Sequence, residues 1–397
     1  MDSTFQAVID CGRNLFSQNI NEGSSGCISC RLDDGGYAAS ISGAPFKELK
    51  EEDVKREGLG DNNLLSYIYE AFPYINAVIV SSTPYVLESA RKNGAITAAL
   101  DDMAQIIGLN VKILSGKDKR EIIRALKCRF GCIIKDVGMI TVGRSLEEAY
   151  TAALVMDKAA KVSVYASGIG GVNPLGRLSC LVEHAIYQKK YSKINGKFLN
   201  RQKTSGGDIE YKELRQQIVD YGRRLVQEGL VQGTWGNIAA RCDETYMLVT
   251  PSGIDYDILK PEDIVKVNMY TLEYEGCLKP TSEKRLHAAI LKSRKEIGAV
   301  IHTHSSWCSV VASSRAKFLP VKSEDMMQHV LGAPKVTEHA LPTTKKQAQA
   351  AMEAMMDRNA CLLGNHGVIC CGENLSKAFE TCRVMEMAAE RYVKSDN

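Results

Sequence analysis

GAVIHTHSSW (298–307) and NAVIVSSTPY (76–85) are similar to each other, and this similarity is the strongest indication of the fold. The other matched pairs keep the same order along the chain: GSSGCISCR (23–31) with GTWGNIAAR (233–241), SGAPFKELKEEDV (42–54) with SGIDYDILKPEDI (252–264), and VGRSLEEAY (142–150) with CGENLSKAF (371–379). The offset rises from 210 (23 to 233) through 222 (76 to 298) to 229 (142 to 371), as small loop insertions would cause. Similar blocks in a preserved order predict two copies of one domain in tandem.

A polar stretch rich in Lys, Gly and Ser, KINGKFLNRQKTSGGD (193–208), lies between the two copies. This composition is typical of a linker between domains. We therefore expect a first domain over residues 1–195, a linker over 196–207 and a second domain over 208–397.

Each copy has the pattern of a mixed α/β domain. Near-continuous apolar runs, such as 299–301 and 361–363, are typical of strands in a buried sheet. Segments 283–297 and 375–393 carry apolar residues at three- and four-residue spacing, which predicts amphipathic helices. We expect the first of these helices to start near residue 282, with Ser282 as its N-cap.

The overall composition is that of a globular protein without a nucleic-acid or membrane partner. Hydrophobic residues make up 45% and charged residues 24% of the chain, and the formal net charge is +3. No block of like charge, bilayer-length apolar run or secretory signal pattern is visible. The 13 scattered cysteines suit free thiols in a reducing compartment, so we expect a cytoplasmic protein.

Three histidines form a candidate metal site. His302 and His304 alternate at the end of an apolar strand run, so their imidazoles can share one face. His366 lies in the Gly-flanked motif GNHGV. Three neutral imidazoles and an open fourth position are typical of a catalytic zinc site. The alternative is that His302 and His304 are two half-exposed strand histidines without a ligand.

The C-terminal half resembles the class II aldolase/adducin family, and within it the small zinc aldolases that act on L-fuculose 1-phosphate. The motifs that carry the resemblance are GTWGNIAAR, TPSGIDYDIL, KPTSEKRLH, AVIHTHSS and GNHGV. It implies an α/β fold, namely a tandem duplication of a three-layer α/β/α domain with a central, mainly antiparallel sheet.

The resemblance also implies roles for particular residues. His302, His304 and His366 match the zinc ligands, with one Zn²⁺ per chain in the C-terminal domain, although another divalent metal would also fit. Glu283 matches the acidic catalytic residue, and His287, one helical turn later, is expected to support or pack. Six residues match the positions that hold the substrate phosphate: Gly236, Asn237, Ser252, Gly253, Thr281 and Ser282.

The implied activity is a metal-dependent aldolase. Such an enzyme cleaves a ketose 1-phosphate, such as L-fuculose 1-phosphate, into dihydroxyacetone phosphate and an aldehyde through a zinc-stabilised enediolate. Other reactions on a sugar phosphate stay open: a methylthioribulose-phosphate dehydratase-like, a 4-epimerase-like or a decarboxylase reaction. A non-catalytic, adducin-like binding scaffold is the alternative from a different class. The family's tyrosine is missing from 319–330, so Glu324, Asp325 or His329 could take its place.

The N-terminal copy is expected to be degenerate and non-catalytic. Val80, Ser82 and Val137 stand where the C-terminal copy has its three histidines. Asp61 stands at the position of Glu283, and Cys27 at that of Asn237, whereas Ser42-Gly43 matches Ser252-Gly253. Because family members assemble as rings, the resemblance implies a homo-oligomer, either a dimer forming a pseudo-four-fold ring or a tetramer.

Overall fold

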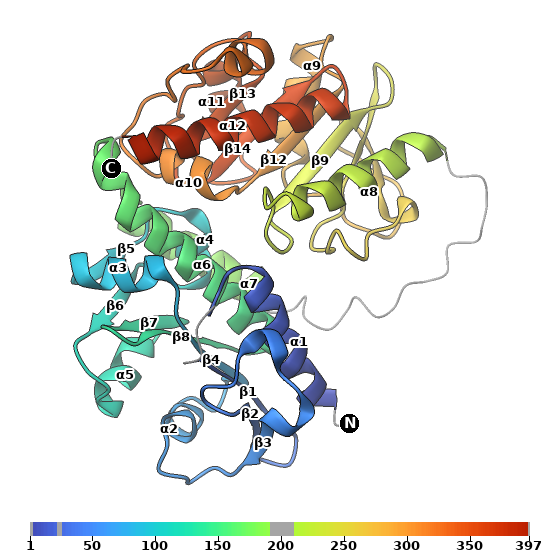
Figure 1. Ribbon diagram of the computed structural model, residues 1–397. Coiled ribbons are helices and arrows are strands. Elements are labelled where there is room, and N and C mark those ends of the chain that lie inside the picture. The colour runs from blue at the N-terminus through green and yellow to red at the C-terminus, as the bar shows by residue number, and fades with distance from the viewer. Residues whose placement is uncertain (1–2, 22–25, 191–209, 396–397) are drawn as a thin grey trace. The chain divides into compact units, whose positions relative to one another are not determined.

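The computed structural model describes residues 3–21, 26–190 and 210–395, which form two compact units (Figure 1). The N-terminal unit comprises Met1–Val164 and Pro174–Phe198, and the C-terminal unit comprises Tyr165–Asn173 and Leu199–Asn397. The segment Tyr165–Asn173, which the sequence placed in the first domain, therefore groups with the C-terminal unit. The expected linker 196–207 lies outside the described residues.

The N-terminal unit contains an eight-stranded sheet in the order β3-β2-β1-β4-β8-β7-β6-β5. Neighbouring strands are antiparallel except β6 and β7, which are parallel. The strands are β1 (Cys27–Arg31), β2 (Tyr37–Ser40), β3 (Val54–Glu57), β4 (Ala77–Ser81), β5 (Ala95–Thr97), β6 (Asn110–Leu114), β7 (Gly131–Ile134) and β8 (Gly138–Gly143). The α-helices are α1 (Ser3–Ser17), α2 (Leu64–Ala71), α3 (Pro84–Lys92), α4 (Asp101–Ile106), α5 (Lys119–Leu126), α6 (Leu146–Tyr165) and α7 (Arg177–Lys190), with short 3-10 turns at Phe46–Glu48 and Glu51–Asp53.

The C-terminal unit contains a six-stranded antiparallel sheet in the order β11-β10-β9-β12-β14-β13. The strands are β9 (Gly236–Arg241), β10 (Tyr246–Val249), β11 (Val265–Asn268), β12 (Ala299–Thr303), β13 (Ala360–Leu363) and β14 (Gly367–Gly372). The helices are α8 (Lys212–Gln227), α9 (Lys284–Ser293), α10 (Ser306–Ala312), α11 (Lys345–Met355) and α12 (Leu375–Ser395), with short turns at Ala166–Ile169, Pro261–Asp263 and, in π-helical form, Met326–Val330.

The two sheets confirm the tandem duplication. The order β3-β2-β1-β4-β8-β7 matches β11-β10-β9-β12-β14-β13 strand for strand. The register matches too, because Cys27 lies opposite Val80 as Asn237 lies opposite His302. The N-terminal unit extends the common sheet by β5 and β6. The fold class read from the repeated sequence blocks is therefore correct.

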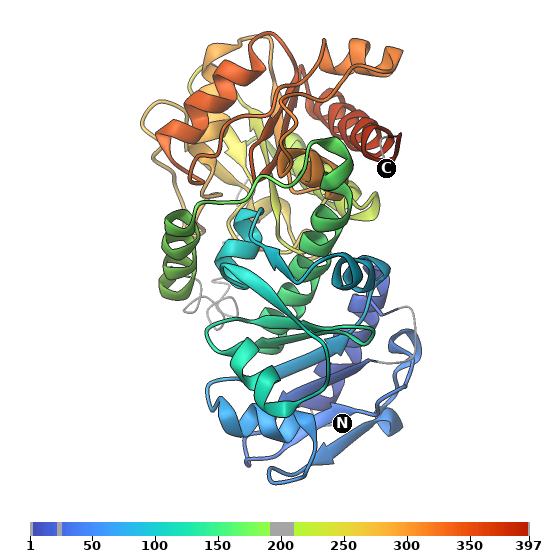
Figure 2. The same cartoon turned by 90° about the vertical axis from the view of Figure 1, so that its left-hand side faces the viewer.

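Helices cover both faces of the sheet in the C-terminal unit. α8, α10 and α12 pack on one face, and α9 and α11 pack on the other (Figure 1). Figure 2 shows that helices also lie on both sides of the N-terminal sheet. Burial of apolar side chains between the C-terminal sheet and α9 and α11 stabilises this layer, and its buried members include Met247, Val249, Val267, Leu286, Ile290, Leu291, Val300, Ala351, Met355 and Leu363.

The helix expected near residue 282 begins two residues later, at Lys284. Glu283 takes the N-cap position, with no capping bond from its side chain, and Ser282 is exposed. The expectation that Ser282 caps the helix is therefore wrong. The Oγ1 atom of Thr281 instead accepts a hydrogen bond from the backbone N–H of Glu283, at 3.3 Å. Because the Glu283 carboxylate does not cap α9, it can contact other side chains of the C-terminal unit.

All thirteen cysteines are free thiols, as expected. Among the described residues, none of the helices combines the length and the apolar character needed to cross a membrane.

Candidate active site

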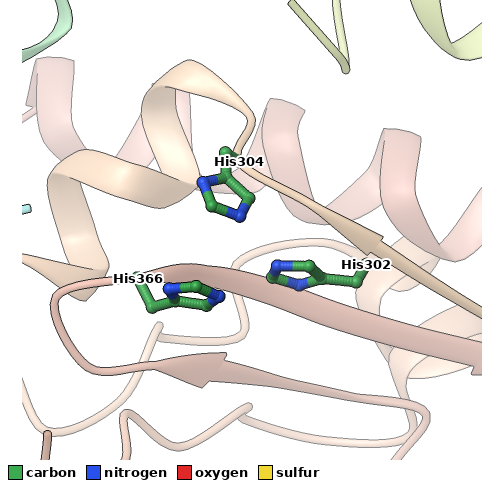
Figure 3. Close-up of side chains that lie close together, drawn as sticks. All are labelled: His302, His304 and His366. Atoms are coloured by element: carbon green, nitrogen blue, oxygen red, sulfur yellow. The ribbon is translucent and has the colours of Figure 1, made fainter. Parts of the chain in front are cut away.

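His302, His304 and His366 converge at one end of the C-terminal sheet (Figure 3). His302 lies in β12 and His304 directly follows it, while His366 lies in the turn between β13 and β14. The ring centroids are 4.7 Å apart for His302–His304, 4.9 Å for His302–His366 and 4.6 Å for His304–His366. Each ring offers a nitrogen within 4.8 Å of the other two. The alternation of side chains along β12, which predicted a shared face, thus brings two of the rings together. The turn between β13 and β14 supplies the third ring.

The surroundings of the three rings fit a metal ion. His302 and His366 are buried, whereas His304 is half-buried, so the site has one open side. The Nδ1–H of His302 donates to the carbonyl of Val368 at 2.9 Å, which leaves Nε2 without its proton. This Nε2 is buried and accepts no hydrogen bond in the protein. Burial lowers the pKa of His302 to about 3, so the ring is neutral and can coordinate a cation.

The carboxylate of Glu283 lies against two of these rings. Its Oε2 is 3.2 Å from Nε2 of His302, and its Oε1 is 3.3 Å from Nε2 of His366. Only 5% of Glu283 is exposed. Burial alone would raise the pKa of Glu283, but hydrogen bonds from the imidazole of His366 and the amide of Asn237 help to hold it well below its usual range. The site therefore combines a nitrogen ligand set with a buried, ionised carboxylate.

Two side-chain amides contact the same carboxylate. Nδ2 of Asn237 donates to Oε2 of Glu283 at 2.9 Å, and Nε2 of Gln347 donates to Oε1 at 3.3 Å. His287, expected to support or pack, is fully buried and bonds Asn237 through Nε2. Sequence reasoning missed Gln347, because its only signal is a polar residue on the buried side of α11, far along the chain from Glu283.

The residues expected to hold a phosphate lie on three adjacent segments. Gly236 and Asn237 begin β9, next to β12. Pro251 and Pro280 form a β-bridge, and the N–H of Ser252 donates to the carbonyl of Lys279 at 2.9 Å. Thr281 is buried, Gly236 and Ser252 are half-buried, and Gly253 and Ser282 are exposed. Strand pairing and backbone hydrogen bonds thus join these segments to each other, whereas the side-chain bonds of Asn237 go to Glu283 and His287.

Gly236 shows why these turns need glycine. Its φ is 139°, a backbone angle that residues with a side chain rarely adopt. A Cβ atom there would lie 2.8 Å from Cγ2 of Val231 and 3.0 Å from the carbonyl oxygen of His302. Any larger residue would therefore push on the strand that carries His302.

The segment Tyr165–Asn173 supports the turn that carries His366. Asn365 has a left-handed backbone, with φ of 62°, and is buried. Its Nδ2 donates to the carbonyl of Asn173 at 2.7 Å, and the N–H of Asn173 donates to the carbonyl of Ser313 at 2.8 Å. The neighbour of a candidate ligand is thus held by residues far away in the sequence.

Glu386 of α12 anchors the turn that follows His304. Its Oε2 accepts from Oγ of Ser305 at 2.7 Å and from the N–H of Cys308 at 2.9 Å, and its Oε1 accepts from the N–H of Trp307 at 2.7 Å. The N-terminal unit has the same contact, since Oγ1 of Thr83 donates to Asp157 of α6. Because the N-terminal copy keeps this contact without the histidines, we assign it to the fold.

Replacing Glu386 with alanine is expected to destabilise the C-terminal unit by about 2–3 kcal/mol, the usual size for lost hydrogen bonds to a charged group. Both tryptophans, Trp235 and Trp307, lie in this unit, so the fluorescence of urea-unfolded samples measures its free energy of unfolding. Glu390→Ala on the same helix is the control, because Glu390 makes only an exposed ion pair with Lys394. That control should lose less than about 1 kcal/mol, and equal losses in both variants would contradict the assignment.

A family model described as Class II Aldolase and Adducin N-terminal domain matches residues 6–164 and 216–393. The chain belongs to this family. The two matched segments correspond to the two copies of the repeat, so both units are class II aldolase-type domains.

Relatives of this class II aldolase family protein match about half of the chain. A 5-deoxy-D-ribulose 1-phosphate aldolase of Bacillus thuringiensis is 36% identical over 46% of this chain and 84% of the relative. An L-fuculose phosphate aldolase of Haemophilus influenzae is 34% identical over 46% of this chain and 83% of the relative. A solved structure of L-fuculose 1-phosphate aldolase is 34% identical, with a TM-score of 0.44 over 46% of this chain and 86% of its own.

His287 makes the stability of the C-terminal unit depend on pH. Burial lowers the pKa of His287 from 6.5 to about 4, so between these values the unfolded chain binds more protons than the folded one. Stability is therefore complete above about pH 6.5 and falls as the pH drops toward 4. From pH 7 to pH 5 we expect a loss of about 2 kcal/mol from this group.

Urea unfolding at pH 7 and pH 5, followed by tryptophan fluorescence with a chelator present, measures this loss. In His287→Gln the same pH change should cost about 2 kcal/mol less, because the titrating group is absent. An identical pH dependence in the two proteins would show that His287 is not buried as a neutral ring.

Proposed function

We propose that the C-terminal unit is a metal-dependent aldolase, a carbon–carbon lyase acting on a ketose 1-phosphate such as L-fuculose 1-phosphate. The products would be dihydroxyacetone phosphate and an aldehyde. The observation that carries this proposal is the Glu283 carboxylate, buried within 3.2–3.3 Å of two of the three convergent imidazoles. The relatives named as sugar-phosphate aldolases support the reaction class.

His302, His304 and His366 would hold the cation, and their neutral nitrogens suit Zn²⁺, with another divalent metal as the alternative. When bound, the cation would stabilise the negative charge that develops on the enediolate oxygens during the cleavage. His304 is the least buried of the three, so the substrate would approach from its side.

Glu283 is suited to move a proton at the reacting centre. Retro-aldol cleavage removes a proton from a hydroxyl, breaks the neighbouring carbon–carbon bond and protonates the carbon of the resulting enediolate. An ionised carboxylate beside the cation site can carry a proton between solvent and that carbon or oxygen. The second proton-transfer group stays open, with Glu324, Asp325 and His329 of the tyrosine-free segment as candidates.

The phosphate is proposed to bind at the turns around Gly236, Ser252-Gly253 and Thr281-Ser282. Backbone N–H groups of Gly-containing turns and small hydroxyls can hold an anion without Lys or Arg. Asn237 contributes to the same edge, although it also bonds Glu283.

The N-terminal unit is proposed to be a non-catalytic class II aldolase-like domain. The shared register places Val80 at the position of His302, and the turns before β8 and β14 place Val137 at that of His366. We propose that this domain supports assembly into a dimer with a pseudo-four-fold ring, or into a tetramer. Light scattering measures the assembly, and a fully active monomer would contradict it.

Elemental analysis of the purified chain and a screen of ketose 1-phosphates test the activity. The screen includes L-fuculose 1-phosphate and 5-deoxyribulose 1-phosphate, because the relatives are named for both sugars. We expect about one zinc ion per chain and release of dihydroxyacetone phosphate, detected by its coupled reduction. Bound metal without cleavage of any ketose 1-phosphate would favour one of the other sugar-phosphate reactions, and neither metal nor cleavage would favour a binding scaffold. The free thiols suit a cytoplasmic location, which fractionation would test.

A further inference from the structure

Two side-chain amides hold the two oxygens of Glu283, and each amide is itself oriented by a second group. Oε1 of Gln347 accepts from the backbone N–H of Thr343 at 2.8 Å. Since that N–H can only donate, the amide must turn its Nε2 outward, and Nε2 lies 3.3 Å from Oε1 of Glu283. The donor end of Gln347 is therefore aimed at the carboxylate by the start of α11.

The second amide is oriented in the same way by a buried imidazole. Nδ2 of Asn237 donates to Oε2 of Glu283 at 2.9 Å, so Oδ1 of Asn237 faces Nε2 of His287. Because Oδ1 can only accept, Nε2 of His287 must carry the proton. Nδ1 of His287 is buried without a hydrogen-bond partner, so no acceptor is present there for a proton, in agreement with protonation at Nε2.

We propose that His287 and Gln347 are positioning residues for the reaction, which hold the Glu283 carboxylate against the histidine centre through one amide donor on each oxygen. This inference rests on the proposed function, because it assigns Glu283 the proton-transferring role. Neither residue needs to touch the substrate. Each adds a hydrogen bond that restricts the rotation of the Glu283 side chain, which makes no capping bond at the start of α9.

Comparison with the N-terminal unit distinguishes this hydrogen-bond network from contacts that only stabilise the fold. At the matched positions the N-terminal unit has Leu65 for His287, Cys27 for Asn237 and Asp61 for Glu283. The third position after the N-cap, which Gln347 occupies in α11, holds Glu121 in α5, whose carboxylate has no N–H to donate. The network is thus absent where the three imidazoles are absent. In contrast, the Glu386 contact persists as Thr83 with Asp157. A domain of the same fold therefore forms without the His287 and Gln347 contacts, which indicates that they serve the site.

Substitutions that remove each donor test the proposal in the full chain. In Gln347→Met and His287→Leu, kcat for ketose 1-phosphate cleavage should fall about 10- to 100-fold, as is usual for groups that orient site residues. KM and zinc content should stay within about twofold. His287→Gln should recover most of the loss, since its amide can donate to Asn237. Gln349→Met is the matched control, because Gln349 lies on the exposed side of α11, and its kcat should not change.

A double-mutant cycle distinguishes positioning from general packing. In a Glu283→Gln background the two substitutions should lower kcat less than twofold, because the carboxylate that they position is gone. If they lower kcat equally in both backgrounds, or leave kcat unchanged in the native background, the proposal is wrong. Should His287→Leu fail to fold, Gln347→Met alone decides between these outcomes.

Imidazole ¹⁵N spectra of the metal-free chain give a readout that does not depend on activity. At neutral pH the signals lost in His287→Gln should be those of a neutral ring protonated at Nε2. A ring protonated at Nδ1, or a charged ring, would overturn the proposed orientation of Asn237. If no ketose 1-phosphate is cleaved by the native protein, the proposed function fails, while these spectra still decide whether the oriented network exists.

Discussion

His304→Ala is expected to remove the proposed metal ion and the proposed aldolase activity together. The three imidazoles offer nitrogens within 4.8 Å of one another, so each would supply one of the three protein ligands of the proposed metal site. Zinc sites with four protein ligands bind the ion with a free energy of about 10–16 kcal/mol. If the four ligands contribute equally, the loss of one imidazole should lower the affinity for zinc by roughly 100- to 1,000-fold. His304 is half-buried and follows β12, so its replacement by alanine should leave the sheet intact.

Elemental analysis, zinc titration and the cleavage assay are the measurements. Ser82→Ala is the matched control, since Ser82 stands at the position of His304 in the N-terminal copy. It should keep both the metal and the activity. Normal zinc content in His304→Ala would show that the three rings do not share an ion.

Glu283→Gln is expected to lower kcat by about 10²–10⁴ while the metal stays bound, because that is the usual contribution of a general acid–base group. Glutamine has almost the same shape as glutamate, and the three imidazole ligands remain. It lacks the charged oxygen that can accept and return a proton. The rates of dihydroxyacetone phosphate release and the zinc content of the same preparation decide the outcome.

Asp61→Asn is the control for this change. Asp61 stands at the position of Glu283 in the N-terminal copy and is exposed. We expect unchanged turnover in this variant. Turnover near the native value in Glu283→Gln would transfer the acid–base role to another group, and loss of zinc in Glu283→Gln would instead make the carboxylate part of the metal site.

The local sequence pattern was sufficient to predict the two-domain architecture and the three candidate metal ligands. Matched blocks in a fixed order predicted two copies of one domain, and the sheets have the same strand order. The two-residue period of a strand predicted that His302 and His304 share a face, because successive side chains alternate across a sheet. GNHGV was recognised by its place between two apolar runs, which are β13 and β14.

Other features depended on how distant elements pack. The contact of Gln347 with Glu283 requires α9 and α11 to lie side by side on one face of the sheet, and no local pattern encodes that neighbour. The same holds for Asn365, whose partner Asn173 comes from a segment that the sequence assigned to the other domain.

The repeat, the strands and the residues whose spacing follows a backbone period could therefore be predicted from local sequence. The start of α9, the orientation of the Glu283 carboxylate and the partners of Asn237 became known only from the packed domain. The two groups of features differ in the range of the interactions that produce them. Backbone periodicity acts over a few residues, whereas a side-chain hydrogen bond depends on two atoms meeting at about 3 Å after the whole layer has packed.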